Sequence, residues 1–330
     1  MTVIEGVDVD QTILLNHIKF AIINNDPIEE KLHVIVVASN PCNYKRRVIL
    51  TKEFINRMNF EQNVILYVVE LAYKNEPYYL TEEDNPKHLQ LRTEVPLWHK
   101  ENLINIGIKK LLPSKWKACA WIDADIEFES PTWALDTLKI LNGAKDIVQL
   151  FSHCVDMNKD GVCSKIFQSF GFQYNKGIKY TSSGLNYFHS GFGWAITRKA
   201  YEKIGGLYDL SILGSGDFNI ALSLIGQAIK SVDRGESENY KQSVLKYEDK
   251  VKGLRVGYTP GVIRHYFHGS KKFRFYESRW KILTRLNYEP DIHITKDNDG
   301  LIIPTMRCPN ELLSSIMEYF ESRNEDEFFE

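Results

Sequence analysis

Residues 117–128, KACAWIDADIEF, are an apolar run that ends in acidic residues. Two similar runs precede it, KLHVIVVASN at 31–40 and NVILYVVELAY at 63–73. Segments with helical periodicity separate the three runs, at 44–58 and at 98–112. Strands that alternate with helices are typical of parallel pairing through crossover connections. The sequence therefore predicts an α/β fold with a mostly parallel central sheet flanked by helices.

The rest of the chain has weaker local patterns. Residues 74–97 are polar, and residues 151–193 are rich in Gly, Ser, Asn and aromatic side chains, so both are expected to form loops. Residues 230–257 carry many charges and are expected to be exposed. Further elements are expected as an amphipathic piece around Ile13–Ile23, helices over Arg198–Ile204 and Phe218–Ala228, and an amphipathic helix after Pro309 that runs into an acidic tail.

Composition excludes several classes of protein. Hydrophobic residues make up 43% of the 330 residues and charged residues 25%, values that exclude wholesale disorder. The net charge is -2, so the chain lacks the overall basic surplus of a protein that binds nucleic acid through phosphate contacts. The net charge does not exclude a local basic patch.

Cysteine usage and hydropathy indicate where the protein works. The five cysteines are scattered, with no C-x-x-C pair, so neither a disulfide framework nor a structural zinc site is indicated. No apolar run approaches the ~18 residues of a membrane helix, and acidic residues stand where a signal peptide has basic ones. We expect a soluble, cytoplasmic or cytosol-facing protein with reduced thiols and no integral membrane segment.

The strongest chemical signal is the pair Asp123 and Asp125 at the end of the third apolar run. In open parallel sheets, ligands bind beyond the carboxyl ends of the strands. On an extended strand, residues i and i+2 share a face, so both carboxylates are expected to converge on one cation, Mn²⁺ or Mg²⁺, that holds a diphosphate. The alternative is two solvated acids at a strand end.

Two later segments also carry candidate groups. In Gly214-Ser215-Gly216-Asp217, small residues allow close approach to a ligand, and Asp217 is either a general base or a helix N-cap. The segment RHYFHGSKK at 264–272 offers imidazoles for a metal and basic groups for phosphate, unless it is a surface cluster.

His265 and His268 are not expected to bind the same cation. They are three residues apart and point to opposite faces of an extended segment. Gly269 and Lys271 follow closely, which favours His268 as the ligand.

Several motifs together resemble one family. They are LYVVELAY (66–73), LWHKENLINIGIKKLL (97–112), WIDADIEF (121–128), HSGFGWAITRKAYEKIGGLYD (189–209), GSGDFNIAL (214–222) and HGSKK (268–272). Over about residues 32–280 the chain resembles metal-dependent GT-A glycosyltransferases of the β-1,4-galactosyltransferase and polypeptide N-acetylgalactosaminyltransferase type. It departs from the family's acceptor motif at Ser215-Gly216 and at Asp217, which replaces a glutamate.

The resemblance implies a fold and an activity. The fold would be GT-A, a Rossmann-like domain, with a helical C-terminal extension. Its parts would be an N-terminal strand and helix extension (1–30), a donor-binding half (31–150), an acceptor-binding and catalytic half (151–280) and the extension with its acidic helix (281–330). The enzyme would move a hexosyl or N-acetylhexosaminyl group from a nucleoside-diphosphate sugar, most readily a UDP-sugar, to a hydroxyl of a glycan, glycoconjugate or protein, with inversion.

The resemblance also implies roles for individual residues. Asp125 would bind the metal, His268 would complete its coordination, Asp123 would hold the metal's waters or the donor ribose, and Asp217 would be the general base. Lys271 and Arg274 would neutralise phosphate. Donor binding would further involve residues of the matched motifs and of the first two strand ends: Ala38, Ser39, Asn40, Glu70, Lys100, Gly191 and Trp194.

Two other functions are weighed against this one. A sugar-1-phosphate nucleotidyltransferase is expected to have a Gly-rich phosphate loop after the first strand, and SNPCNYKRR at 39–47 has no glycine. A non-catalytic nucleotide-sugar-binding protein would keep the metal-binding acids and lose the base.

Overall fold

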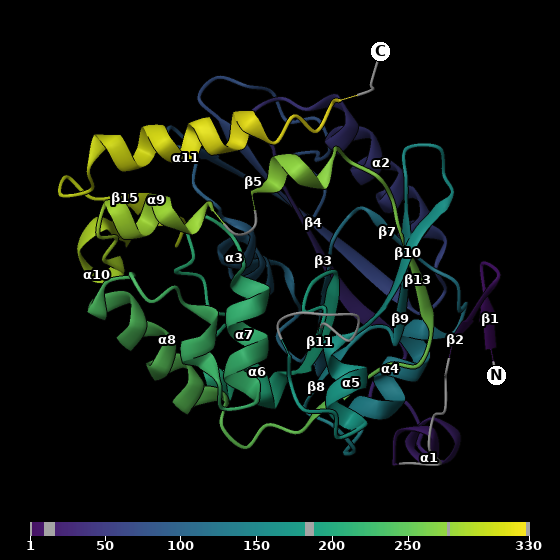
Figure 1. The fold of residues 1–330 in the computed structure, drawn as a ribbon. Coiled ribbons are helices and arrows are strands. Elements are labelled where there is room, and N and C mark those ends of the chain that lie inside the picture. Colours follow the sequence, from purple (N-terminus) through teal and green to yellow (C-terminus); the bar gives the residue numbers. More distant parts are fainter. Residues whose placement is uncertain (1, 10–16, 182–187, 276–277, 328–330) are drawn as a thin grey trace.

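A seven-stranded sheet forms the centre of the computed structural model, which describes residues 2–9, 17–181, 188–275 and 278–327 (Figure 1). The strand order is β12-β8-β11-β6-β3-β4-β5. The strands are β3 (Leu32–Ser39), β4 (Val64–Tyr73), β5 (His88–Thr93), β6 (Ala118–Ile122), β8 (Ile147–Gln149), β11 (Gly193–Thr197) and β12 (Val256–Tyr258). All neighbours pair in parallel except β11, which is antiparallel to β6 and β8. The predicted α/β class with a mostly parallel sheet is confirmed.

Helices cover both faces of this sheet, which explains why its central strands are continuously apolar. On β3, Val34 and Val36 pack with Phe54 of α2 (Lys45–Phe60) and with α4 (Trp133–Leu141). Ile35 points to the other face, where α3 (Lys100–Leu111) packs. Side chains alternate along a strand, so β3 contributes to both cores.

A second sheet of four strands adjoins the first, in the order β10-β9-β13-β7. The strands are β7 (Ile126–Phe128), β9 (His153–Met157), β10 (Cys163–Gln168) and β13 (Val262–His265). The run 117–128 is therefore two strands in two sheets, with Asp123 and Asp125 in the link between them. The expectation that these two acids share one face of an extended strand is wrong for this reason.

Segments expected to be loops contain regular structure. β5 lies within 74–97, but it is an edge strand with only Leu91 and Thr93 buried, so its apolar pattern is weak. β9, β10 and α5 (Phe170–Asn175) lie within 151–193. The sequence does not predict β9, because buried polar residues, His153 and Asp156, interrupt its apolar pattern.

Two helices of the second half, α6 and α7, lie close to their predicted positions, and a third, α8, lies in a segment for which no helix is predicted. α6 (Arg198–Ile204) has the predicted bounds, and α7 (Gly216–Leu224) begins two residues early and ends before the short 3-10 helix η1 (Ala228–Ser231). The charged segment 230–257 is not simply exposed. It contains α8 (Glu238–Val251), an amphipathic helix whose buried face packs into the core.

The last part of the chain lies against the sheet's helices and reaches the start of α2 (Figure 1). It comprises the 3-10 helix η2 (Lys271–Arg274), α9 (Trp280–Arg285), α10 (Pro290–His293), the hairpin β14 (Ile294–Lys296) and β15 (Ile302–Pro304), and α11 (Asn310–Ser322). α11 is the amphipathic helix that the sequence predicts, and the Tyr44 hydroxyl donates to the Phe320 carbonyl at its end (2.8 Å).

At the other end, β1 (Thr2–Ile4) and β2 (Val7–Val9) form a hairpin before α1 (His17–Asn24). The expected amphipathic piece at Ile13–Ile23 lies partly outside the described residues. Among the helices of the described ranges, none is both long enough and apolar enough to cross a bilayer. All five cysteines are free thiols, as their spacing predicts.

Gly107 controls how closely α3 approaches the sheet. A Cβ at Gly107 would lie 2.8 Å from Val69 Cγ2 and 3.3 Å from Ile35 Cγ2. We predict that Gly107→Ala destabilises the protein by about 1–2 kcal/mol, because overpacking outweighs the better helix propensity of alanine. Urea denaturation measures the change.

Lys52→Ala, on the exposed side of α2, is the control and is expected to change stability by less than ~0.5 kcal/mol. A Gly107→Ala protein as stable as its parent would contradict the packing argument.

Candidate functional site

A cavity of about 550 Å³ opens beyond the carboxyl ends of β3 and β6. This is where an open α/β sheet binds its ligands. Most residues singled out from the sequence line it: Ala38, Ser39, Lys100, Asp123, Asp125, Gly191, Asp217, His268, Lys271 and Arg274. The structure thus gathers into one cavity residues that are spread over more than two hundred positions of the sequence.

Three sequence-predicted donor residues are not brought to this cavity. The Asn40 side chain bonds both the amide and the carbonyl of Tyr44 and closes the turn before α2 (3.0 Å each). Glu70 accepts from the amides of Tyr79 (2.7 Å) and Leu80 (3.1 Å) and so holds the loop after β4. Trp194 is 2% exposed, packs in the core and donates to the Ser190 carbonyl.

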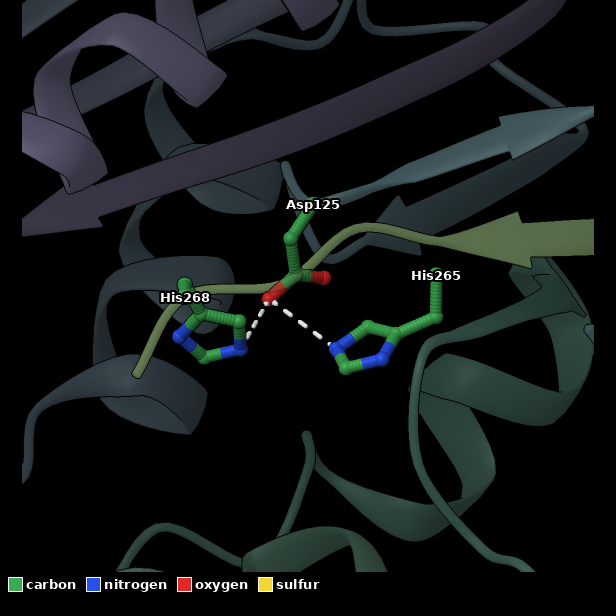
Figure 2. Close-up of side chains that lie close together, drawn as sticks. All are labelled: Asp125, His265 and His268. Atoms are coloured by element: carbon green, nitrogen blue, oxygen red, sulfur yellow. Dashed lines mark ion pairs between the residues drawn. The ribbon is translucent and has the colours of Figure 1, made fainter. Parts of the chain in front are cut away.

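Asp125, His265 and His268 form a cluster on the cavity wall (Figure 2). The Asp125 Oδ2 lies 2.9 Å from His268 Nε2 and 3.7 Å from His265 Nε2. Figure 2 shows both rings directed at the same carboxylate oxygen. One potential ligand atom from each residue lies within 4.8 Å of the other two, a spacing suited to a single metal ion.

The expectation that only one of the two histidines reaches this point is wrong. β13 ends at His265, so His268 lies beyond the strand and the alternation rule does not extend to it. Antiparallel pairing of β13 with β7 places His265 opposite Ile126, next to Asp125. The Tyr266 amide donates to the Asp125 carbonyl (2.8 Å) and holds the turn toward His268 in place.

The donor set fits a divalent cation. Among the described residues no hydrogen-bond donor reaches Asp125 Oδ1, although this oxygen is buried. Burial opposes ionisation of Asp125, yet the two histidines hold its pKa well below the ordinary value. An ionised carboxylate with one buried oxygen left unsatisfied, beside two imidazoles, suits Mn²⁺ better than Mg²⁺, which prefers oxygen ligands.

A second carboxylate lies behind His265. Asp156 Oδ1 accepts from His265 Nδ1 (2.7 Å), because parallel pairing of β13 with β9 sets His265 opposite Asp156. This bond places the ring proton on Nδ1 and leaves Nε2 for a metal. Burial opposes ionisation of Asp156, but its bonds with His265 and Lys271 lower its pKa to about 2. No local motif marks Asp156, because its partner His265 lies on another strand.

A separate ion pair also lines the cavity. Lys100, at the start of α3, pairs with Asp123 (Nζ to Oδ1, 2.5 Å). Asp123 is therefore directed at Lys100 and is not part of the cluster around Asp125. Burial acts against the charge on Lys100, but the carboxylates of Asp123, Asp217 and Glu101 together raise its pKa.

Asp217 is not the N-cap of α7. The cap position is Ser215, whose side chain makes no capping bond, and Asp217 follows in the first turn. Its Oδ1 accepts from the Phe218 amide (2.9 Å). Its Oδ2 lies so close to Gly191 that a Cβ there would be 2.9 Å away. Asp217 thus lies outside the cap position, with one carboxylate oxygen on a first-turn amide of α7 and the other facing the Gly191 wall of the cavity.

The cavity also has basic residues that sequence reasoning did not single out: Arg47, Lys165, Arg279 and Arg323. Arg279 is 6% exposed and bonds the hydroxyls of Ser215 and Tyr319. Arg323 lies over the Trp98 ring, 5.3 Å from its centroid. No local motif marks these arginines, since they come from segments that reach the site only through tertiary packing.

No protein-family model and no curated protein matches the chain. Among solved structures, a mannosyltransferase from Pyrobaculum calidifontis in complex with GDP-Man and Mn²⁺ is similar at 16% identity and a TM-score of 0.45, over 79% of this chain and 64% of that one. This chain thus spans less than two thirds of that protein's length. The catalytic domain of Drosophila β1,4-galactosyltransferase 7, in complex with xylobiose, is similar at 11% identity and a TM-score of 0.40, over 87% of this chain and 99% of that one.

The inositol-1-phosphate CTP transferase from T. maritima is also similar, at 13% identity and a TM-score of 0.34, over 72% of this chain and 89% of that one. A β1,4-galactosyltransferase, the type that the sequence resembles, is thus among the similar structures. At these identities and TM-scores the likeness by itself assigns no activity to this chain.

Glu101 yields a prediction on the pH dependence of stability. Burial and the nearby Asp217 raise its pKa from 4.5 to about 8. Between these values the folded chain keeps the Glu101 proton and the unfolded chain loses it, so this group makes the protein less stable as pH rises. Gln at this position does not titrate. We predict that from pH 5 to pH 8 the melting temperature of Glu101→Gln rises relative to the parent, by roughly 2–3 °C per pH unit at most.

Thermal melts in EDTA at four pH values measure this difference. Glu53→Gln, on the exposed side of α2, is the matched control and is expected to show a constant offset from the parent. A constant offset for Glu101→Gln as well would contradict a proton held by Glu101 in the fold.

Proposed function

We propose that this protein is a metal-dependent glycosyltransferase that uses a nucleoside-diphosphate sugar. The observation that carries the proposal is the Asp125, His265 and His268 cluster on one wall of a cavity that also holds basic residues and a separate carboxylate, Asp217. The sequence resemblance to GT-A glycosyltransferases supports the same activity. We propose a UDP-sugar as donor and a hydroxyl of a glycan, glycoconjugate or protein as acceptor.

Asp125, His265 and His268 would hold the divalent cation, Mn²⁺ in preference to Mg²⁺. When bound there, the cation stabilises the negative charge that a departing diphosphate acquires. Two imidazoles and one carboxylate also bind Fe²⁺ in oxygen-activating enzymes. A cation that holds a diphosphate is favoured here over an Fe²⁺ that activates oxygen, because many basic side chains line the same cavity. They are Arg47, Lys100, Lys165, Lys271, Arg274, Arg279 and Arg323.

Basic residues near the cluster would receive the phosphate oxygens. Arg274 lies against the His268 ring, with Nη2 2.8 Å from Nε2. Lys271 is half exposed and pairs with Asp156. Both can bond an anion next to the metal, which adds electrostatic stabilisation where charge develops. The ends of β3, at Ala38 and Ser39, and the Lys100–Asp123 pair are the proposed contacts of the nucleoside.

Asp217 would accept the proton of the acceptor hydroxyl. As the hydroxyl oxygen bonds the anomeric carbon, the bond from that carbon to the diphosphate oxygen breaks, the electron pair leaves with the diphosphate, and the proton moves to the Asp217 carboxylate. A single displacement of this kind inverts the anomeric centre. Lys100 and Glu101 lie beside Asp217 and would set its charge environment.

The alternative of a sugar-1-phosphate nucleotidyltransferase is less consistent with the geometry. Such an enzyme binds phosphate at the loop and helix that follow the first strand. Here the first amides of α2, those of Lys45 and Arg46, already donate to the Asp326 carboxylate (2.9 Å each). A purely binding protein has no need of a carboxylate placed like that of Asp217.

Activity is tested by incubation with a panel of nucleoside-diphosphate sugars and Mn²⁺, followed by assay of free nucleoside diphosphate. A glycosyltransferase releases it slowly even without acceptor. Release of pyrophosphate from a nucleoside triphosphate and a sugar phosphate would support the nucleotidyltransferase instead, and binding without turnover would support a binding protein.

We predict that Asp125→Asn weakens Mn²⁺-dependent binding of a nucleoside diphosphate more than tenfold, because the only carboxylate of the cluster loses its charge. Thermal shift with and without Mn²⁺ measures this, since a ligand at ~100 times its Kd stabilises by roughly 2.7 kcal/mol. Asp160→Asn, in an exposed turn, is the control. Binding that is equally strong in both variants would remove Asp125 from the metal site.

We predict that Asp217→Asn lowers transfer by roughly 10²–10⁴-fold while donor binding and melting temperature stay close to those of the parent. The amide keeps the shape of the side chain but cannot take a proton. Steady-state transfer rates and donor titrations measure the two effects. Transfer at the parental rate would show that another group is the base.

A further inference from the structure

Residues 323–327, which follow α11, form part of the wall around the proposed metal site. The Glu325 side chain is only 1% exposed. Its carboxylate accepts from Arg47 through Nη2 (2.6 Å) and Nε (2.9 Å), and from Arg323 through Nε (2.7 Å). Burial opposes its ionisation, but the two guanidinium groups hold the pKa of Glu325 well below the ordinary value. A fixed, buried anion thus lies at the edge of the site.

This anion faces a proposed metal ligand. Glu325 Oε2 lies 3.7 Å from His268 Nδ1, an ion-pair distance, on the opposite side of the ring from Asp125. The same order of groups occurs at the other histidine, where Asp156 lies behind Nδ1 of His265 at 2.7 Å. Each imidazole therefore has Nε2 on the side of Asp125 and a buried carboxylate on the side of Nδ1; at His268 the Arg274 Nη2 also lies 3.2 Å from Nδ1.

The backbone of the segment is held close to His268. Gly269 has a φ of +93°, and a Cβ there would lie 2.9 Å from the Cα of Glu325, so glycine is required for this approach. Asp326 accepts from the amides of Lys45 and Arg46, and the Asn324 amide donates to the Tyr44 hydroxyl (3.1 Å). Contacts on both sides of Glu325 thus fix its position.

We propose that Glu325 is a positioning residue of the metal centre, which orients His268 for the cation and makes the 323–327 segment part of the site. The inference rests on the proposed function, because it requires a cation at Asp125, His265 and His268. When Nε2 of a neutral imidazole binds a metal, its proton is on Nδ1, and a carboxylate there orients the ring and raises its basicity. Arg47 and Arg323 also line the cavity, so Glu325 joins the metal site to its basic wall.

The test is the Mn²⁺ affinity of Glu325→Gln, measured from the electron paramagnetic resonance signal of free Mn²⁺. Loss of a carboxylate behind a ligating histidine weakens metal binding by roughly 10–100-fold. Glu321→Gln is the matched control: it removes the same charge from an exposed side chain near the end of α11 and leaves the Glu325 carboxylate and its contacts in place. We expect the control to bind Mn²⁺ within about twofold of the parent.

A double variant separates positioning from general destabilisation. If Glu325 acts through His268, adding Glu325→Gln to His268→Ala weakens Mn²⁺ binding no further than His268→Ala alone. Additive losses would overturn the inference and indicate a structural role. If Glu325→Gln does not fold, Glu325→Asp replaces it, because it keeps the charge on a shorter side chain. This variant is expected to weaken Mn²⁺ binding measurably but less than tenfold. A Mn²⁺ affinity equal to that of the parent would overturn the inference.

Failure of this inference is distinguishable from failure of the proposed function. A parent protein that binds no Mn²⁺ contradicts the proposed function and with it the role of Glu325. A parent that binds Mn²⁺, with Glu325→Gln binding equally well, contradicts only the inference about Glu325.

Discussion

The site depends on the position of β13 between β7 and β9. Pairing with β7 sets His265 beside the link that carries Asp125, and pairing with β9 sets the same histidine opposite Asp156. One short strand therefore brings together two proposed metal ligands, Asp125 and His265, and the carboxylate of Asp156 that orients His265. Because β7 continues directly from the link after β6, this arrangement is attached to the central sheet, whose rigid core fixes the position of the cluster.

Balance of charge is the second constraint on the cavity. Three ion pairs of opposite charge line it: Lys100 with Asp123, Lys271 with Asp156, and Arg47 with Glu325. Ionised groups at low solvent exposure are tolerated only with such partners. A diphosphate with its cation brings charges of both signs, so it can enter this environment without leaving a basic side chain or a carboxylate unpaired.

The sequence predicted the central α/β framework because its signals are local: β3 and β4 are continuous apolar runs, and α3 has one apolar face. It also identified Asp125, His268 and Asp217 as residues of one cavity. It failed where the structure depends on pairing between distant segments. The sequence does not show where β13 ends, so it does not predict that His265 and His268 converge, and Glu325 lies in the acidic tail, whose contacts with α2 and His268 arise only in the tertiary structure.

The central claim is that Asp125, His265 and His268 bind one divalent cation beside a nucleoside diphosphate. The most direct measurement is anomalous X-ray diffraction at the manganese edge from crystals grown with Mn²⁺ and UDP. The account predicts one strong anomalous peak within coordination distance of the Asp125 carboxylate and of Nε2 of both histidines, with phosphate oxygens on its cavity side. A peak coordinated elsewhere, or a diphosphate bound in the cavity with no manganese at this cluster, would contradict it.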